Sequence, residues 1–428
     1  MKYQFLNSSV LGTDLNKSKS INIIGAGISG LMLGYHLKKA NIPFKIFEKS
    51  DKVGGILGTE KCQNGLAEKS ANGTLWCPAF TGMCTDLGLD ILEPNAGKKA
   101  RFLVRDKKLS QMPLKMMELS NAIFKSMFSK PEKPETLRDF GERYFNKQMT
   151  DYLLEPAFLG IYNGLANELS FPATMPSLAK LLNENNSLAW GGIKNIFNSK
   201  KDPAKIPGTL SFKNGMQELI NALHQHLRND IELNATIDPK NKQNDQFVIC
   251  TPAYVAKDFF EEDLNSIIGE IKYSSNVSMT LFFEKSKIKN FKEGFGCLIS
   301  RKEELDILGV LFNSCIFQHR VVSDDLLSFT CIMRDFDGTL QQKNDVEMVN
   351  FVMKDLNKIF QIDGQPVEHK IFRWQKGIPI YTPTLYNNWF EINAKLKSNY
   401  KNINLFGNYT SQISIRGMCT EAYKYTAK

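Results

Sequence analysis

The distribution of apolar residues near the N-terminus predicts a strand–helix–strand unit. Ile21–Ile24 and Phe44–Phe47 are short apolar runs typical of buried strands. Between them, Ser29–Lys39 carries apolar residues at helical spacing. Two strands joined by one helix over so short a span form a βαβ crossover, in which the strands run parallel.

The periodicity then becomes helical and later returns to that of strands. From Gln111 to about Leu182 the pattern is helical, and the prolines before Glu135 separate one helix from the next, which begins near that residue. Six strand-like runs follow: Ile231–Ile237, Phe247–Thr251, Val277–Phe283, Gly296–Ser300, Ile307–Phe312 and Leu326–Ile332. The chain ends with a short strand at Asn404–Phe406 and a helix from about Ile413 to Thr426.

This order of elements predicts an α/β fold with an α+β part inserted into it. We expect residues 20–97, 206–270 and 371–428 to form a Rossmann-like nucleotide-binding domain. Residues 98–110 and 271–370 are expected to form an antiparallel substrate sheet. Residues 111–205 are expected to form a helical insertion at the substrate entrance or at a membrane surface.

Composition fits a globular protein with room for two or three domains, because 42% of the 428 residues are hydrophobic and 23% are charged. The first twenty residues lack the apolar core of a signal peptide, and no apolar run is long enough to span a membrane. The eight cysteines contain no CxxC pair, so we expect reduced thiols and a cytoplasmic protein. The five scattered histidines do not predict a metal site.

A glycine-rich turn connects the first strand to the first helix. It reads Gly25-Ala26-Gly27-Ile28-Ser29-Gly30, with glycines where a tight turn, a pyrophosphate and close helix packing require them. Glu48 ends the second strand, where a carboxylate can accept hydrogen bonds from a ribose diol. These features predict a dinucleotide site; the alternative is an ordinary turn with a surface glutamate.

The residues after this glutamate resemble the second fingerprint of flavoproteins of the amine oxidase and protoporphyrinogen oxidase superfamily. The run is Glu48-Lys49-Ser50-Asp51-Lys52-Val53-Gly54-Gly55-Ile56-Leu57-Gly58-Thr59. The resemblance implies FAD, with Gly54 and Gly55 crossing near its pyrophosphate and with Lys49 and Ile56 beside them. Ser70-Ala71-Asn72-Gly73 stands where relatives have a Gly-Pro element near the flavin.

The C-terminal region resembles the third cofactor contact of the same superfamily. Gly407 follows the last strand, and the resemblance puts Ile413, Ser414 and Ile415 at the flavin pyrimidine, where a helix N-terminus stabilises negative charge. Gln412 replaces the glycine that usually opens this segment. The resemblance also assigns two further residues to the cofactor: Trp374, in a Trp…Ile-Pro-x-Tyr element, and Ile237.

Within that superfamily, the chain resembles the protoporphyrinogen oxidase family over nearly its whole length. The most distinctive stretch runs from Leu154 to Gly164 and is followed by Glu168-Leu169-Ser170; general amine oxidases lack it. The resemblance implies that Arg101 binds a substrate propionate and that Phe295 and Leu298 pack on a pyrrole ring. A solvated arginine and two sheet-core residues are the alternatives. Met333-Arg334 replaces the family's Gly-Gly pair.

The resemblance implies oxidation of protoporphyrinogen IX to protoporphyrin IX. Three hydride transfers to the flavin would require no catalytic side chain, and O2 or another acceptor would take the electrons, giving H2O2 in the case of O2. Coproporphyrinogen III oxidation on the same scaffold is the nearest alternative. An amine oxidase, a carotenoid desaturase and a flavin-free binding module like the Rab-escort and GDI proteins remain further alternatives. A homodimer is compatible with each.

The net charge of +9 is concentrated in two segments. Residues 97–135 hold ten Lys and Arg against four Asp and Glu, and residues 194–205 hold four against one. Apolar residues lie among these lysines: Met116, Met117, Ile123, Phe124, Met127 and Phe128 in the first segment, and Trp190, Ile193, Ile196 and Phe197 near the second. The pattern suits peripheral contact with a membrane or packing at a substrate entrance, and it does not suit nucleic acid.

Overall fold

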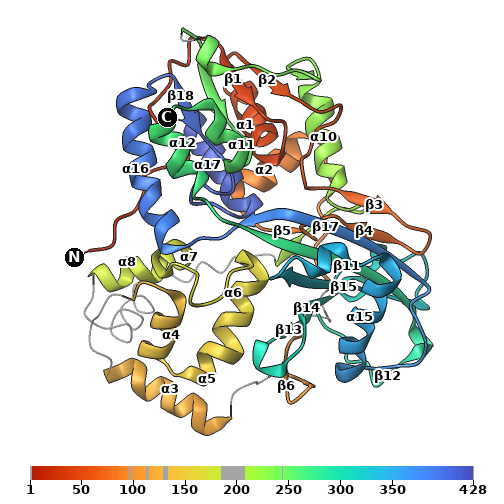
Figure 1. Ribbon diagram of the computed structural model, residues 1–428. Helices are drawn as coiled ribbons and strands as arrows, with labels where there is room; N and C mark the ends of the chain where they lie inside the picture. Colours follow the sequence, from red (N-terminus) through yellow and green to blue (C-terminus); the bar gives the residue numbers. More distant parts are fainter. Residues whose placement is uncertain are drawn as a thin grey trace.

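The computed structural model describes residues 2–95, 97, 100–111, 115–128, 134–184, 208–242 and 244–427, without the side chains of 119, 122, 123, 127 and 128. Two sheets dominate the described chain. Figure 1 shows the parallel sheet with its helices in the upper part, the larger sheet at the lower right, and a group of helices at the lower left.

The first sheet has five strands in the order β18-β10-β1-β2-β9, all parallel. They are β18 (Ile403–Leu405), β10 (Gln246–Ile249), β1 (Ile21–Ile24), β2 (Phe44–Glu48) and β9 (Ile231–Leu233). Helices α1 (Ile28–Lys39), α10 (Gln217–Leu227) and α17 (Ile415–Ala427) contribute to the hydrophobic cluster that packs on it. The predicted βαβ unit is confirmed. Strand β9 is shorter than expected and is followed by Asn234 in the left-handed region, with φ 53°.

The second sheet has seven strands in the order β17-β11-β15-β14-β13-β6-β7. Their bounds are β17 (Glu368–Pro379), β11 (Tyr273–Glu284), β15 (Leu326–Asp335), β14 (Ile307–Phe312), β13 (Gly296–Ile299), β6 (Arg101–Arg105) and β7 (Lys108–Ser110). Only the β13–β6 pair is parallel among the pairings of this sheet. One face packs on α15 (Asp345–Ile359), as the shared buried cluster of Val277, Met279, Val352 and Leu356 shows.

Successive side chains of a strand alternate between the two faces of a sheet, so every second residue of these strands points to the face opposite α15. The hairpin of β3 (Thr59–Lys61) and β4 (Leu66–Glu68) covers its β17 side, through the Lys370–Glu60 ion pair. Helix α6 (Glu155–Tyr162) covers β13 and β14. We call this the inner face.

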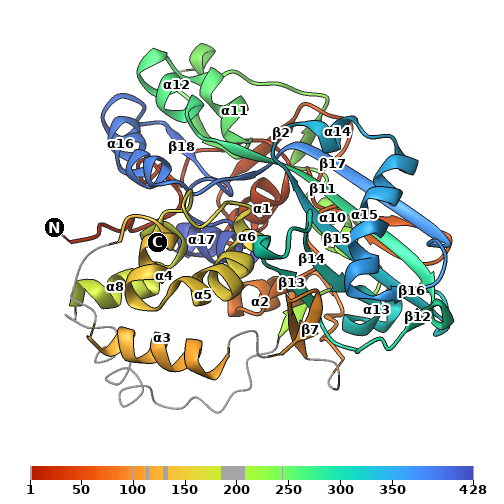
Figure 2. The ribbon, with the colours of Figure 1, turned by 60° about the horizontal axis from the view of Figure 1, so that its bottom comes forward.

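The group of helices contains α3 (Met116–Phe128), α4 (Leu137–Tyr144), α5 (Lys147–Met149), a π-helical turn (Thr150–Leu154), α6, α7 (Phe171–Thr174) and α8 (Pro176–Glu184). Helix α4 starts close to the predicted position because Thr136 and Asp139 form a capping box. Figure 2 shows α3 at the edge of this group. Its side chains Met116, Met117 and Phe124 are exposed. Peripheral membrane contact stays a prediction, and the second basic segment lies outside the described residues.

The remaining elements connect the two sheets or cover their edges. They are β5 (Thr74–Leu75), α2 (Pro78–Asp86), β8 (Thr209–Leu210), α11 (Ala253–Ala256), α12 (Glu262–Gly269), β12 (Ile288–Lys289), α13 (Asn313–Ile316), α14 (Thr339–Gln342), β16 (Gln361–Ile362) and α16 (Pro383–Asn399). No helix in the described part of the chain is long and apolar enough to cross a membrane. Strand β17 pairs with β11 on both sides of residue 371, and the division into domains stays a prediction.

Candidate active site

The two glycine motifs predicted for a nucleotide lie side by side at the end of β1. The Gly54 N–H donates to the Ala26 carbonyl at 2.8 Å, and Gly27 pairs with Gly54 as an isolated bridge. Glu48 connects the same loops, because its carboxylate accepts from the Ala26 N–H at 2.8 Å and from the Ser50 N–H at 3.0 Å. Folding therefore builds one glycine-rich cradle from residues 25–30 and 54–55 at the N-terminus of α1.

The glycines of the first motif differ in what surrounds them. A Cβ on Gly30 would lie 2.0 Å from the Gly25 carbonyl oxygen, so helix and strand packing require this glycine. A Cβ on Gly27 would meet nothing within 4 Å, so packing within the described chain does not require Gly27. A bare backbone beside open space at a helix N-terminus suits a closely approaching phosphate. The cradle fits a dinucleotide.

Other residues assigned to the cofactor lie around this cradle or near it. Ile28 and Ser29 are in the first turn of α1, while Lys49 and Ile56 flank the second glycine motif. Ile237 is buried with Phe247 and Ile249 of the parallel sheet. The role of each in binding stays a prediction.

The N-termini of α1 and α17 meet at the same place. The Ser29 hydroxyl lies 3.1 Å from the Met418 sulfur, and Figure 2 shows α17 next to α1. Helix α17 begins at Ile415, so Ile413 and Ser414 precede it, and Ser414 accepts from the Gly417 N–H at 3.0 Å. Two helix N-termini beside one another stabilise negative charge.

Gln412 and Gly407 lie in the segment between β18 and α17. A Cβ on Gly417 would lie 2.2 Å from the Gln412 carboxamide oxygen, so the glutamine packs on the bare backbone of Gly417. The Gly407 N–H donates to the Thr410 hydroxyl at 3.1 Å, which fixes the turn after β18.

The segment that contains Ser70, Ala71, Asn72 and Gly73 is held from the larger sheet. The Trp374 indole N–H donates to the Lys69 carbonyl at 2.9 Å. Immediately before it, Glu68 lies 3.0 Å from Arg320, and both side chains are 1% exposed. Burial raises the pKa of Glu68 and lowers that of Arg320. The two residues before the predicted flavin-side loop are thus held by Trp374 of β17 and by Arg320.

The three predicted substrate residues are neighbours at one end of the inner face. The Arg101 guanidinium lies over the Phe295 ring, 4.8 Å from its centroid. Leu298 pairs with Gly309 and Leu103, and a Cβ on Gly160 of α6 would lie 3.3 Å from it. The register shows that Leu311 and Ile332 share this face, a placement that local sequence patterns do not reveal.

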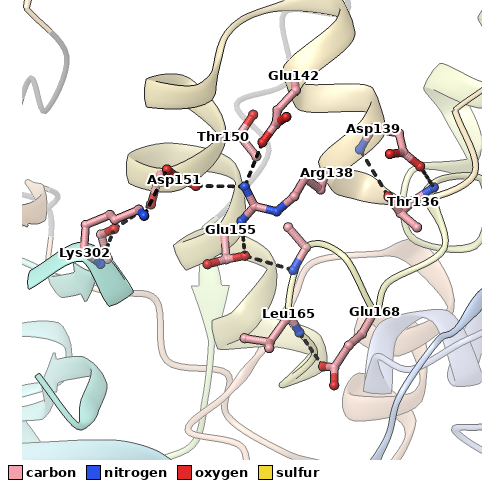
Figure 3. A network of polar contacts seen from close by, with 12 residues as sticks. Thr136, Arg138, Asp139, Glu142, Thr150, Asp151, Glu155, Leu165, Glu168 and Lys302 are labelled. Carbon is pink, nitrogen blue, oxygen red and sulfur yellow. Dashed lines mark hydrogen bonds and ion pairs between the residues drawn. The ribbon is translucent and has the colours of Figure 1, made fainter. Parts of the chain in front are cut away.

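Arg138 fixes the helical segment that covers Leu298. Figure 3 shows its guanidinium between Asp151 at 2.9 Å, Glu155 at 2.8 Å and Glu142 at 3.0 Å. The side chains of Asp151 and Glu155 are buried, so they depend on this cation. The π-helical turn and α6 are therefore held in place by one arginine from α4.

Arg334 occupies the site of a glycine in the family pattern and makes an ion pair. Its guanidinium binds both carboxylate oxygens of Glu168, at 2.6 and 3.2 Å, and stacks on Phe336. Glu168 also accepts from the Leu165 N–H, as Figure 3 shows. The pair with Arg334 therefore joins the sheet to the loop after α6.

The cations of the inner face are mostly neutralised. If the edge strand β7 is left aside, the strand register places four cations on the inner face: Arg101, Arg105, Arg334 and Lys370. Arg105 pairs with Glu118 at 2.7 Å, Arg334 pairs with Glu168, and Lys370 pairs with Glu60. Arg101 is exposed and has no carboxylate partner among the described residues. It is available to an anionic ligand.

Comparisons with known proteins identify the family to which the chain belongs. The family described as flavin containing amine oxidoreductase matches residues 28–418. Protoporphyrinogen oxidase 2 of Arabidopsis thaliana is 26% identical, with 93% of this chain and 91% of that protein covered. Coproporphyrinogen III oxidase of Staphylococcus aureus is 25% identical, with 91% and 94% covered.

Solved structures share the fold. A protein from Exiguobacterium sp. 255-15 superposes with a TM-score of 0.77 at 18% identity, covering 96% of this chain and 98% of that one. Reduced UDP-galactopyranose mutase superposes with a TM-score of 0.72 at 14% identity, covering 96% and 92%. The proteins that resemble this chain include oxidases and a mutase, and the mutase has the same fold. The fold alone therefore does not identify a reaction.

Proposed function

Because the chain belongs to the flavin-containing amine oxidoreductase family, it is an oxidoreductase with a flavin cofactor, and we propose that it uses FAD to oxidise protoporphyrinogen IX to protoporphyrin IX. The relatives named for porphyrinogen oxidation, which cover more than nine-tenths of the chain, support a porphyrinogen substrate. The bound flavin would supply a two-electron acceptor for each cycle.

The overall reaction removes six hydrogen atoms from the porphyrinogen in three two-electron steps. Each step takes a hydride from a meso carbon; of the three protons released over the whole reaction, two come from pyrrole N–H groups and one from the fourth meso carbon, because the product keeps two N–H groups. With O2 as the final acceptor, three O2 become three H2O2, which balances the six electrons and six protons. No general base is assigned, because the chain's task is to hold the macrocycle against the flavin.

Arg101 is the observation that favours protoporphyrinogen. Its unpaired guanidinium suits a carboxylate, and Leu298, Leu311 and Ile332 on the same face of the sheet suit an apolar macrocycle. A tetracarboxylate such as coproporphyrinogen would leave more carboxylates to be matched. The inner face offers few cations for them, since Arg105, Arg334 and Lys370 are already paired.

The proposal is tested with purified, FAD-loaded protein and each of the two porphyrinogens. Porphyrin fluorescence is followed in air and, separately, under anaerobic conditions with H2O2 measured in the aerobic arm. We expect the larger kcat/KM with protoporphyrinogen IX and one H2O2 for each O2 consumed. A larger kcat/KM with coproporphyrinogen III would transfer the proposal to that substrate, and no porphyrin from either would refute it.

The role of Arg101 is tested by Arg101→Gln against a matched control. Arg301 is also an exposed arginine over a phenylalanine ring, 5.1 Å from the centroid of Phe336, but it lies outside the paired strands. We expect Arg101→Gln to raise KM about tenfold or more, the loss of one charge-assisted pair. Arg301→Gln should leave KM within twofold.

A further inference from the structure

Two side-chain oxygens on strand β11 are buried on the inner face without hydrogen-bond partners among the described residues. Asn276 is 8% exposed, and its carboxamide oxygen is fully buried. The hydroxyl oxygen of Ser278 is also fully buried. Neither side-chain oxygen has a partner among the described residues. Buried polar groups in folded proteins are nearly always paired, so two unpaired oxygens so close together require an explanation.

The strand register places both residues next to residues assigned to the flavin and to the substrate wall. Asn276 is opposite Trp374 on one side and Arg334 on the other, and Ser278 is opposite Phe372 and Ile332. Their neighbours Val277 and Met279 point into the core with α15. Asn276 and Ser278 therefore face the same side of the sheet as the apolar residues of the proposed substrate wall.

The other hydroxyl groups of this face are paired within the protein, although the Asn313 carboxamide oxygen has no partner among the described residues. Thr280 and Thr330 share a hydrogen bond of 3.0 Å, and the Asn313 side-chain N–H donates to Thr330 and Ser328. The fold thus can satisfy hydroxyls on this face, and it leaves Asn276 and Ser278 unsatisfied. The cost of an unpaired buried polar group is about 1–3 kcal/mol, so replacement by an apolar residue would stabilise the ligand-free chain. A ligand that pairs with these oxygens would account for their presence.

We infer that Asn276 and Ser278 accept hydrogen bonds from the pyrrole N–H groups of the bound tetrapyrrole. This inference rests on the proposed function. A porphyrinogen carries four pyrrole N–H donors, and its flexible macrocycle can turn them toward one side. The two residues are two apart on one strand, about 7 Å, within the width of one macrocycle. They are substrate-orienting acceptors.

The test compares Asn276→Leu, Ser278→Ala and Ser275→Ala in the FAD-loaded protein. Ser275 is the matched control because it is on the same strand, and its hydroxyl is paired with Gln341 at 3.0 Å. Each protein is mixed anaerobically with protoporphyrinogen IX, and flavin bleaching gives the substrate Kd and the limiting reduction rate. Thermal unfolding without substrate is measured in parallel.

We expect Kd to rise at least tenfold for Asn276→Leu and at least threefold for Ser278→Ala, with Ser275→Ala unchanged. Unfolding temperatures without substrate should stay equal or rise for Asn276→Leu and Ser278→Ala, which a structural role for the two oxygens would not give. Ser278→Ala removes only the hydroxyl oxygen. Its Kd therefore tests the inference even if Asn276→Leu does not fold.

Three results would overturn the inference, and they differ in what they imply. Kd and reduction rate within twofold of wild type in both variants would refute it while leaving the proposed function intact. Loss of bound flavin from both variants would assign the oxygens to the cofactor instead. A wild-type flavin that no porphyrinogen reduces would refute the proposed function and this inference with it.

Discussion

The guanidinium of Arg320 lies 3.0 Å from the carboxylate of Glu68, and both side chains are 1% exposed. Arg320 also donates to the Ser211 hydroxyl at 2.6 Å and to the Phe212 carbonyl at 3.2 Å. Segments far apart in the sequence therefore meet at one buried charge pair, next to the loop assigned to the flavin. Burial of this kind makes the loss of one partner costly, because the other charge stays buried.

Replacing Arg320 tests this relationship. Arg320→Met should lower the free energy of unfolding by about 3–5 kcal/mol, measured by denaturant titration. The control is Lys45→Met, because Lys45 pairs with Glu232 in solvent, with 48% and 47% of the side chains exposed. That change should cost about 0–1 kcal/mol. Equal effects of the two substitutions would contradict the special role of the buried pair.

The two glycines of the first motif should respond differently to one methyl group. Gly27→Ala meets no protein atom within 4 Å, so unfolding of the flavin-free protein should change by less than about 1 kcal/mol, while the flavin content should fall. Gly30→Ala places a carbon 2.0 Å from the Gly25 oxygen and should destabilise the flavin-free protein by about 1–3 kcal/mol. Full flavin binding by Gly27→Ala would count against the cradle.

Arg138 should influence the substrate through α6. Arg138→Met leaves the buried carboxylate of Glu155 without its cation and leaves Asp151 with Lys302 alone, at 3.9 Å. The α6 segment over Leu298 should loosen, with KM for the porphyrinogen rising several-fold and amide exchange of residues 150–162 becoming faster. Arg143→Met is the comparison on the same helix. Unchanged exchange in Arg138→Met would show that the network does not hold α6.

The stability of the protein should fall on acidification because of His36. Burial, followed by the charge of Lys39, lowers the pKa of His36 to about 4. Since the unfolded chain protonates this imidazole at its ordinary pKa near 6.5, the unfolded state binds more protons between these values. The stability that the neutral His36 contributes is therefore fully present above pH 6.5 and is lost as the pH falls toward 4.

This contribution can be separated from those of other groups with a single variant. Between pH 7.5 and pH 5, His36 should account for a loss of about 2 kcal/mol in the free energy of unfolding. His36→Gln should reduce the pH dependence by that amount. A wild type and His36→Gln with parallel pH profiles would contradict this account.

The sequence predicted those parts of the fold that local pattern determines. The βαβ unit and strands such as Ile307–Phe312 have the expected bounds because each is an apolar run with clear breakers. Strand β17 was not predicted, since its residues Glu368–Pro379 alternate with charged side chains that are matched by other segments, as in the Lys370–Glu60 pair. Pairing of this kind is invisible in the strand's own sequence.

The candidate site shows the same division. The glycine cradle could be predicted because its residues are close in sequence and each has a backbone requirement. Leu311, Ile332 and the unpaired oxygens of β11 became candidates only through the register of a seven-stranded sheet. Arg334 could be recognised as a departure from the family pattern, but its ion pair with Glu168 depends on a long-range contact.

The most direct test of the central claim is an anaerobic titration of the FAD-loaded wild-type protein with protoporphyrinogen IX, in which flavin absorbance and porphyrin fluorescence are recorded together. The account predicts that three equivalents of flavin are bleached for each protoporphyrin IX formed, and that air restores the oxidised flavin. A flavin that stays oxidised in the presence of excess protoporphyrinogen IX, with no porphyrin formed beyond the protein-free rate, would contradict it.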